Sequence, residues 1–113
     1  MNRETREKNL ELVLGEMVKR ISEMAGIVRI VLFGSAAQGR MGPDSDIDLL
    51  VVVKDGLHRR RTAQSIFKRL SGLGVPKDIV VVTESDVLAH KDDPGLVISP
   101  ALKTGRELYH APE

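Results

Sequence analysis

Apolar residues near the start of the chain recur at steps of three and four, which is the spacing of an amphipathic helix. Polar residues such as Glu11 and Lys19 fall mostly on the other side, and Gly26 is placed to end this helix in a left-handed cap. The apolar stripe consists of Leu10, Val13, Leu14, Met17, Val18, Ile21 and Met24.

A second helix is predicted over residues 57–70. A third begins after Thr83, where Asp86 completes an approximate capping box. Residues 95–104 are expected to be helical in part, with Pro100 kinking or starting that helix. The residues expected to face inward from the second helix are Leu57, Ala63, Ile66, Phe67 and Leu70.

Runs of β-branched residues predict the strands. Residues 27–33 are apolar except for Arg29, and residues 47–53 are apolar almost throughout, so we expect the latter strand to be covered on both faces. Residues 79–82 predict a third strand, and Leu108 and Tyr109 a short last one. Between the first two strands we expect a short helical turn at 35–39 and a loop at 40–45.

This order of elements predicts an α/β (α+β) fold, a small mixed β-sheet flanked by helices, in a single domain over residues 1–113. The helix between the second and third strands allows those two strands to run parallel. The pattern predicts no particular oligomeric state.

Composition narrows the function classes. The chain has 113 residues, a formal net charge of +1 and no cysteine, which excludes disulfides and thiolate chemistry and suits a cytoplasmic protein. The charged N-terminus is unlike a signal peptide, and no apolar run is long enough to span a membrane. With only two Phe, one Tyr and no Trp, stacking on nucleic acid bases is not expected.

Two carboxylates, Asp46 and Asp48, open the most apolar strand. Side chains two apart in a strand project from the same face, where two unpaired carboxylates repel each other. A cation between them would relieve that repulsion, and Mg²⁺ favours such hard oxygen ligands, taking the rest from water and phosphates. Asp46 and Asp48 are therefore candidate metal ligands.

Gly34 and Ser35 follow the preceding strand. Glycine permits close backbone approach, the N–H groups at a helix start favour phosphate, and the Ser35 hydroxyl adds a donor. If the two strands are neighbours, phosphate donors and metal carboxylates meet at one end of the sheet. Arg40, in the loop that follows, is either a further phosphate contact or a surface residue.

Asp78 stands at the head of the third apolar strand and can be a third carboxylate beside the pair. It would act as general base or as ligand to a second metal ion. Each feature alone has an ordinary explanation as a turn or strand boundary. Together they are more specific, because Gly-Ser followed at this gap by Asp-x-Asp is expected by chance in roughly one such chain per thousand.

Gly34-Ser35, ten intervening residues and then Asp46-Ile47-Asp48 resemble the signature of the DNA polymerase β-like nucleotidyltransferases. The resemblance is closest to their minimal nucleotidyltransferase branch, and it extends through LFGSAAQGR, SDIDLLVVV and KDIVVV over nearly the whole chain. It implies Mg²⁺-dependent transfer of a nucleoside monophosphate, AMP from ATP, with release of pyrophosphate.

By match to the motif, Asp46, Asp48 and Asp78 would be catalytic and metal-binding, with two Mg²⁺ ions possible. Gly34 and Ser35 would hold the triphosphate, and Ser45 is a further phosphate or loop contact. Proteins of this branch resemble antitoxins paired with a helical HEPN-family ribonuclease toxin, and the implied reaction is AMP transfer onto that toxin. Two alternatives remain open: a non-catalytic antitoxin that inhibits by occlusion, and a nucleotidyltransferase acting on a small molecule such as an antibiotic.

A cluster of basic residues lies along the helix predicted over residues 57–70. It consists of His58 to Arg61, with Lys68 and Arg69 farther along the same helix. It is either a solvated helix face or a docking surface for an acidic partner or RNA. Tyr109 is expected to be a packing residue, with self-modification as the alternative.

Overall fold

The computed structural model describes residues 3–39, 46–93 and 97–112, and it is an α+β fold built on one four-stranded mixed sheet. The sheet order is β3-β2-β1-β4, with β1 antiparallel to β2 and β4, and β2 parallel to β3. The elements in chain order are α1 (Arg3–Ser22), β1 (Ile27–Phe33), α2 (Gly34–Ala37), β2 (Ile47–Val53), α3 (Arg59–Arg69), β3 (Lys77–Thr83), α4 (Glu84–His90), α5 (Ile98–Thr104) and β4 (Arg106–His110).

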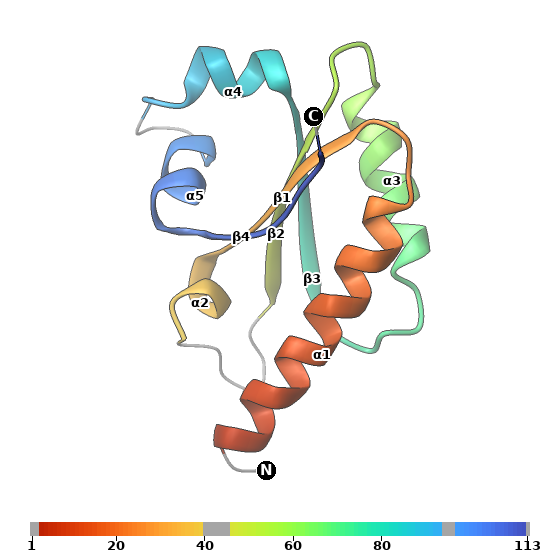
Figure 1. Ribbon diagram of the computed structural model, residues 1–113, viewed down its shortest axis with the longest axis vertical. Coiled ribbons are helices and arrows are strands. Elements are labelled where there is room, and N and C mark those ends of the chain that lie inside the picture. The colour runs from red at the N-terminus through yellow and green to blue at the C-terminus, as the bar shows by residue number, and fades with distance from the viewer. Residues whose placement is uncertain (1–2, 40–45, 94–96, 113) are drawn as a thin grey trace.

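Helices cover both faces of this sheet (Figure 1), with α1 and α3 on one face and α4 and α5 on the other. The short α2 follows the end of β1, and its Ala36 belongs to the core that α1 and α3 cover. Alternation along β2 divides its side chains between the two cores: Leu49 and Val51 pack with α1 and α3, whereas Leu50 and Val52 pack with α5. Both sets are buried, which explains the nearly continuous apolar run of this strand and confirms the prediction that it is covered on both faces.

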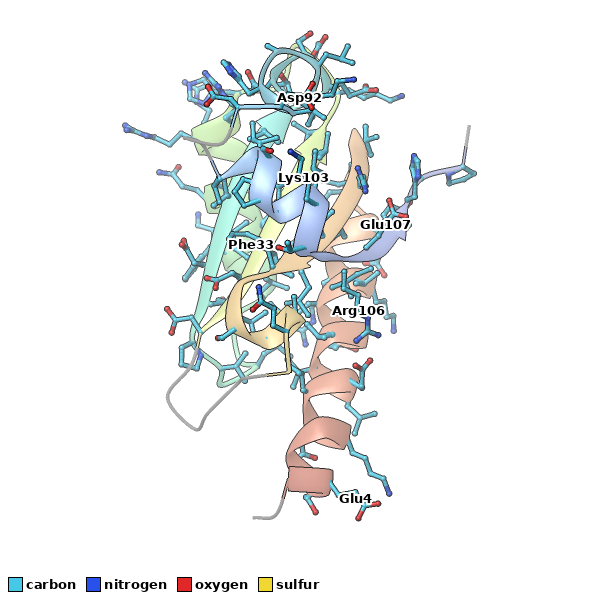
Figure 2. The ribbon with its side chains drawn as sticks, turned by 90° about the vertical axis from the view of Figure 1, so that its left-hand side faces the viewer. Glu4, Phe33, Asp92, Lys103, Arg106 and Glu107 are labelled. Atoms are coloured by element: carbon cyan, nitrogen blue, oxygen red, sulfur yellow. The ribbon has the colours of Figure 1, made fainter. Side chains whose placement is uncertain are left out.

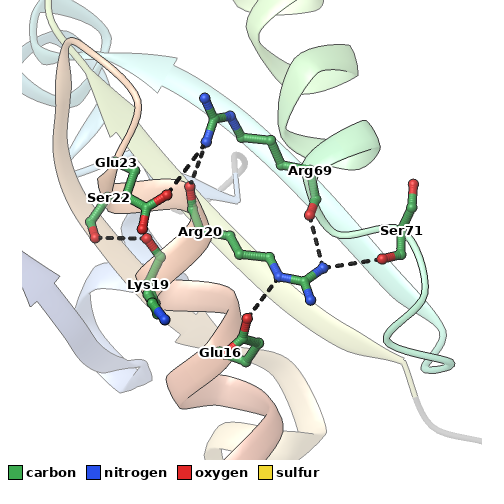
Figure 3. Close-up of polar contacts among 7 residues, drawn as sticks. All are labelled: Glu16, Lys19, Arg20, Ser22, Glu23, Arg69 and Ser71. Carbon is green, nitrogen blue, oxygen red and sulfur yellow. Dashed lines mark hydrogen bonds and ion pairs between the residues drawn. The ribbon is translucent and has the colours of Figure 1, made fainter.

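Two arginines connect the C-terminal ends of α1 and α3 through hydrogen bonds and ion pairs (Figure 3). The Arg20 guanidinium lies 2.9 Å from Glu16 and donates to the backbone oxygens of Arg69 and Ser71 at 3.0 and 3.1 Å. Arg69 in turn donates to the Arg20 carbonyl at 3.4 Å and lies 3.8 Å from Glu23. Because carbonyls at a helix end have no partner within the helix, Arg20 both caps α3 and sets its place against α1.

The predicted helices are confirmed with shifted ends. Helix α1 ends at Ser22, so Met24 lies beyond it, and Gly26 with φ +84° turns the chain into β1. Thr83 and Asp86 form the predicted capping box at the start of α4. In α5, Pro100 stands in the first turn, where its missing N–H costs no helical hydrogen bond.

Two residues predicted to face inward are exposed. Phe67 is 50% exposed, because the buried stripe of α3 is centred on Ile66 and Leu70 and Phe67 lies at its margin. Leu57 is 38% exposed, because α3 begins only at Arg59 and Leu57 belongs to the preceding turn. Strand β3 starts two residues earlier than predicted, which places Asp78 inside the strand. In the described part of the chain, no helix combines the length and apolar character needed to cross a bilayer.

Candidate active site

Three chain segments bring the predicted site residues to one end of the sheet. Antiparallel pairing sets Phe33, the last residue of β1, opposite Asp48 near the start of β2. Parallel pairing sets Asp48 beside Asp78 near the start of β3. Gly34 and Ser35, which follow Phe33, are therefore held next to the carboxylates, as expected if these strands were neighbours.

Asp48 and Asp78 share the sheet face that carries α5. Leu50 and Val80 pack in the core on that face, and Asp48 and Asp78 stand two residues before them in their strands. Figure 2 looks onto this face and shows Phe33 where β1 runs into α2. Asp48 is half-buried and Asp78 is exposed. The face is thus open to solvent at one carboxylate and partly closed at the other.

Gly34 makes room for Asp48. Its φ is +72°, a left-handed conformation that side chains rarely adopt, and a Cβ there would lie 2.3 Å from Oδ2 of Asp48. The sequence suggested that this glycine allows close approach of a phosphate. The structure shows that it allows close approach of a carboxylate, so any larger residue at position 34 would displace Asp48.

The three aspartates are electrostatically linked. The pKa of Asp48 is raised above its ordinary value, first by burial and then by the negative charges of Asp78 and Asp46. Asp46 is exposed and lies just before β2. Because Asp48 loses solvation and faces two like charges, the end of the sheet is a place where a cation would be favourable.

The structure tests whether a divalent cation fits these residues. Among residues 3–39, 46–93 and 97–112, no set of three or more His, Asp or Glu side chains is arranged to hold a metal ion. Mg²⁺, however, commonly takes only one or two protein carboxylates and completes its shell with water and substrate phosphates. Asp48 with one neighbouring carboxylate meets that smaller requirement, because burial first and the charges of Asp78 and Asp46 second raise its pKa, and a nearby cation would offset both effects.

The structure describes some of the predicted phosphate-binding residues and not others. Ser35 is half-buried in α2, which is a single turn of four residues, so the helix start expected there is short. Its carbonyl accepts from the Gln38 N–H at 3.2 Å, which closes that turn. Arg40 and Ser45, both predicted phosphate contacts, lie outside the described residues.

Two other residues singled out in the sequence have structural roles. His58 is the N-cap of α3, and its Nδ1 accepts from the Arg61 N–H at 3.2 Å. Sequence reasoning missed this role, because histidine is not among the usual N-cap residues. Tyr109 is half-buried in β4 and packs against the core beneath α1, which agrees with its predicted packing role.

Comparison with known proteins identifies the family of the chain and structures that share its fold. A family model described as "Nucleotidyltransferase domain" matches residues 14–100, whereas no curated protein matches the chain. The chain is similar to one in the crystal structure of a toxin–antitoxin with AMP-PNP, at 24% identity and a TM-score of 0.63 over 87% of this chain and 73% of that one.

A second similar structure is the toxin–antitoxin MntA-HepT, at 22% identity and a TM-score of 0.57 over 89% of this chain and 73% of that one. A mutant of that toxin–antitoxin, with two aspartates two positions apart changed to glutamate, has 22% identity and a TM-score of 0.62 over 87% and 73% of the two chains. At such identities the likeness to solved structures establishes a shared fold. The family model covers more than half of the sequence, and the chain therefore belongs to the nucleotidyltransferase domain family.

Proposed function

We propose that this chain is a Mg²⁺-dependent nucleotidyltransferase that moves AMP from ATP onto a hydroxyl of a partner protein, acting as the antitoxin of a HEPN-type toxin. The observation that carries the proposal is the paired placement of Asp48 and Asp78 beside Gly34 at one end of the sheet. In this proposal, residues 1–113 form one catalytic domain that works in the cytoplasm.

Asp46 and Asp48 are the residues proposed to hold the metal ion that accompanies the triphosphate. Bound there, Mg²⁺ would neutralise phosphate charge as pyrophosphate departs. Asp48 is held in place by the β-sheet pairing of its backbone and by the close approach of its carboxylate to Gly34. Binding of a metal ion would therefore cost little conformational entropy at Asp48. The Gly34 and Ser35 segment would contribute donors to the phosphates, with Arg40 and Ser45 as further contacts.

Asp78 is proposed to serve the acceptor. It lies beside Asp48 but is exposed, on a strand at the open edge of the sheet. There it would take the proton of the attacking hydroxyl, or bind a second ion, while the hydroxyl oxygen forms its bond to the α-phosphorus. The bond from that phosphorus to the bridging oxygen breaks, and pyrophosphate leaves with the electron pair.

The acceptor is proposed to be a protein because of the structures that share this fold. Two of them are toxin–antitoxin complexes, and one was crystallised with AMP-PNP. A related structure carries changes at two aspartates with the same two-residue spacing as Asp46 and Asp48. These findings favour a protein acceptor over a small molecule.

The test is incubation with labelled ATP and Mg²⁺, with and without a purified candidate toxin, chosen as a small helical protein if a neighbouring gene encodes one, followed by intact-mass measurement. The partner should gain the mass of one or more adenylates, and the Asp48→Asn variant should abolish the gain. Asp92→Asn is the matched control, because Asp92 is exposed and follows α4. A complex that neutralises the toxin without any mass gain would instead support inhibition by occlusion.

A further inference from the structure

The chain has a strongly one-sided charge distribution between Asp55 and Asp78. Residues 56–77 contain six of the 17 lysines and arginines and no acidic residue. Five of the six belong to α3, and three of these, Arg59 to Arg61, fill its first turn. Positive charge at a helix N-terminus opposes the helix dipole and costs stability, so helix formation alone does not favour this arrangement.

Two of these cations are already paired within the fold. Arg59 lies 3.1 Å from Asp86, and Arg69 lies 3.8 Å from Glu23. Arg60, Arg61 and Lys68 are exposed and form no ion pair with any residue that the structure describes. Three charges therefore remain available for a ligand.

Phe67 lies among these free cations. Residues three, four and seven apart share a helix face, so Arg60 and Phe67 lie on one stripe and Arg61 and Lys68 on the next. Phe67 is 50% exposed, and the Lys77 ammonium lies 5.0 Å from the centre of its ring. Aromatic and arginine side chains are enriched at the energetically important centres of protein interfaces.

The location of this surface connects it to the candidate active site. Lys77 and Asp78 are consecutive residues of β3, and their side chains project from opposite faces of the sheet. Strand β3 is an edge strand, so in the described part of the chain no further strand separates the Phe67 side from the Asp78 side. A partner lying across α3 could therefore reach around this edge to Asp78.

The surface is also held rigid. Arg20 caps the last turn of α3 through the Arg69 and Ser71 carbonyls, close to Phe67 and Lys68. His58 caps the first turn, close to Arg60 and Arg61. Binding here would need little ordering of the backbone, which lowers its entropic cost.

We propose that Arg60, Arg61, Phe67, Lys68 and Lys77 form a docking surface for an acidic protein segment that carries an apolar side chain, and that this segment belongs to the acceptor. The location of the acceptor rests on the proposed function, whereas the docking itself needs neither nucleotide nor metal. A protein is favoured over nucleic acid because the surface offers a single aromatic ring, whereas single strands need successive stacking platforms.

The experiment measures binding of a labelled glutamate-rich peptide with one central leucine to the full chain by fluorescence anisotropy. Binding should weaken about tenfold or more in Arg60→Glu/Lys68→Glu and in Phe67→Ser, with recovery in Phe67→Leu. The matched control for net charge is Lys91→Glu/Lys103→Glu, which changes exposed lysines elsewhere and should bind like the parent. Melting temperatures verify that each variant is folded.

Further probes separate the alternatives. A peptide with serine in place of leucine, or glutamine in place of glutamate, should bind much more weakly. Absence of peptide binding, equal loss in the control variant, or tighter binding of a uridine oligonucleotide would overturn the proposal. The Asp48→Asn variant should bind the peptide like the parent, so failure of nucleotide transfer and failure of docking give different results.

Discussion

Asp48 lies directly beside Asp78 across two parallel strands, while its carboxylate oxygen fills the space that a side chain at Gly34 would need. One residue thus connects the acceptor side of the candidate site with the segment predicted to hold phosphate. Most of the expected behaviour of the site follows from this double contact.

The first prediction concerns pH. Burial and the charges of Asp78 and Asp46 raise the pKa of Asp48, so the folded state holds that proton more tightly than the unfolded state does. The free energy of unfolding contributed by Asp48 therefore falls as pH rises from the unfolded pKa through the folded one. In the metal-free protein, Asp48→Asn should be slightly more stable than the parent at neutral pH.

This gain should be small, because Asp48 is only half-buried and solvent screens part of the repulsion. The measurement is urea unfolding of both proteins from pH 3 to 8 in the presence of a chelator. The difference should vanish in acid, where Asp48 is protonated in both states. A parent that is more stable than the variant at neutral pH would contradict the unfavourable charge assigned to Asp48.

The second prediction separates strain from collision at Gly34. Gly34→Ala forces a left-handed alanine and also places a Cβ against the Asp48 carboxylate. Gly74 has a similar φ of +70°, but no atom lies within 4 Å of the place a Cβ would take, so Gly74→Ala incurs the backbone strain alone, about 1–2 kcal/mol. Gly34→Ala should cost more than Gly74→Ala in thermal unfolding and should also lose ATP binding, whereas Gly74→Ala should keep it.

The third prediction concerns metal and nucleotide together. If the metal bridges the carboxylates and the triphosphate, ATP with Mg²⁺ should raise the melting temperature more than either ligand alone. Asp46→Asn and Asp48→Asn should reduce that increase, and Asp92→Asn should not. The absence of any increase in the parent at millimolar ligand would count against a nucleotide site at this end of the sheet.

The sheet and its central strand were predictable because each depends on local patterns. The apolar run over residues 47–53 indicates a strand that is buried on both faces. The helix predicted between this strand and the next permits the two strands to pair in parallel. The apolar residues of α3 were less informative, since Phe67 is adjacent to Ile66 in sequence and could belong to either side of the buried stripe. Tertiary packing against β3 decided that it is exposed.

The contact between Gly34 and Asp48 could not be derived in this way. It depends on the register of two strands that are separated by residues 34–46 in the sequence, and a one-residue change in register would turn Asp48 to the opposite face. The sequence supported the proximity of Gly34 to the carboxylates, but it favoured phosphate as the neighbour of that glycine. Only the paired positions identify Asp48 as the group that excludes a Cβ.

The fourth prediction concerns Ser35. If its hydroxyl contacts a phosphate, Ser35→Ala should weaken ATP binding by about 1 kcal/mol or more, the scale of a hydrogen bond to a charged group. Stability should change little, because Ser35 lies in a single turn at the end of β1. Calorimetric titration with ATP and Mg²⁺ measures the difference. Equal affinities in parent and variant would remove Ser35 from the proposed site.

The last prediction concerns the separate roles of the three carboxylates in nucleotide binding and in transfer. Asp46 and Asp48 are proposed to hold the metal that carries the triphosphate, so their asparagine variants should lose both ATP affinity and transfer. Asp78 is assigned to the acceptor side, and Asp78→Asn should bind ATP with Mg²⁺ nearly as well as the parent. Its transfer rate should fall about a hundredfold or more, as is typical when a general base is lost.

Stability provides an independent readout for the same variant. Because the charge of Asp78 contributes to the raised pKa of Asp48, its removal should bring that pKa closer to its ordinary value and leave the metal-free protein no less stable. The experiment pairs calorimetric ATP affinity with transfer rate to the acceptor protein, for all three asparagine variants. Full transfer by Asp78→Asn would leave Asp78 as an exposed residue of an edge strand, and a parallel loss of ATP affinity would move it to the metal and triphosphate side of the site.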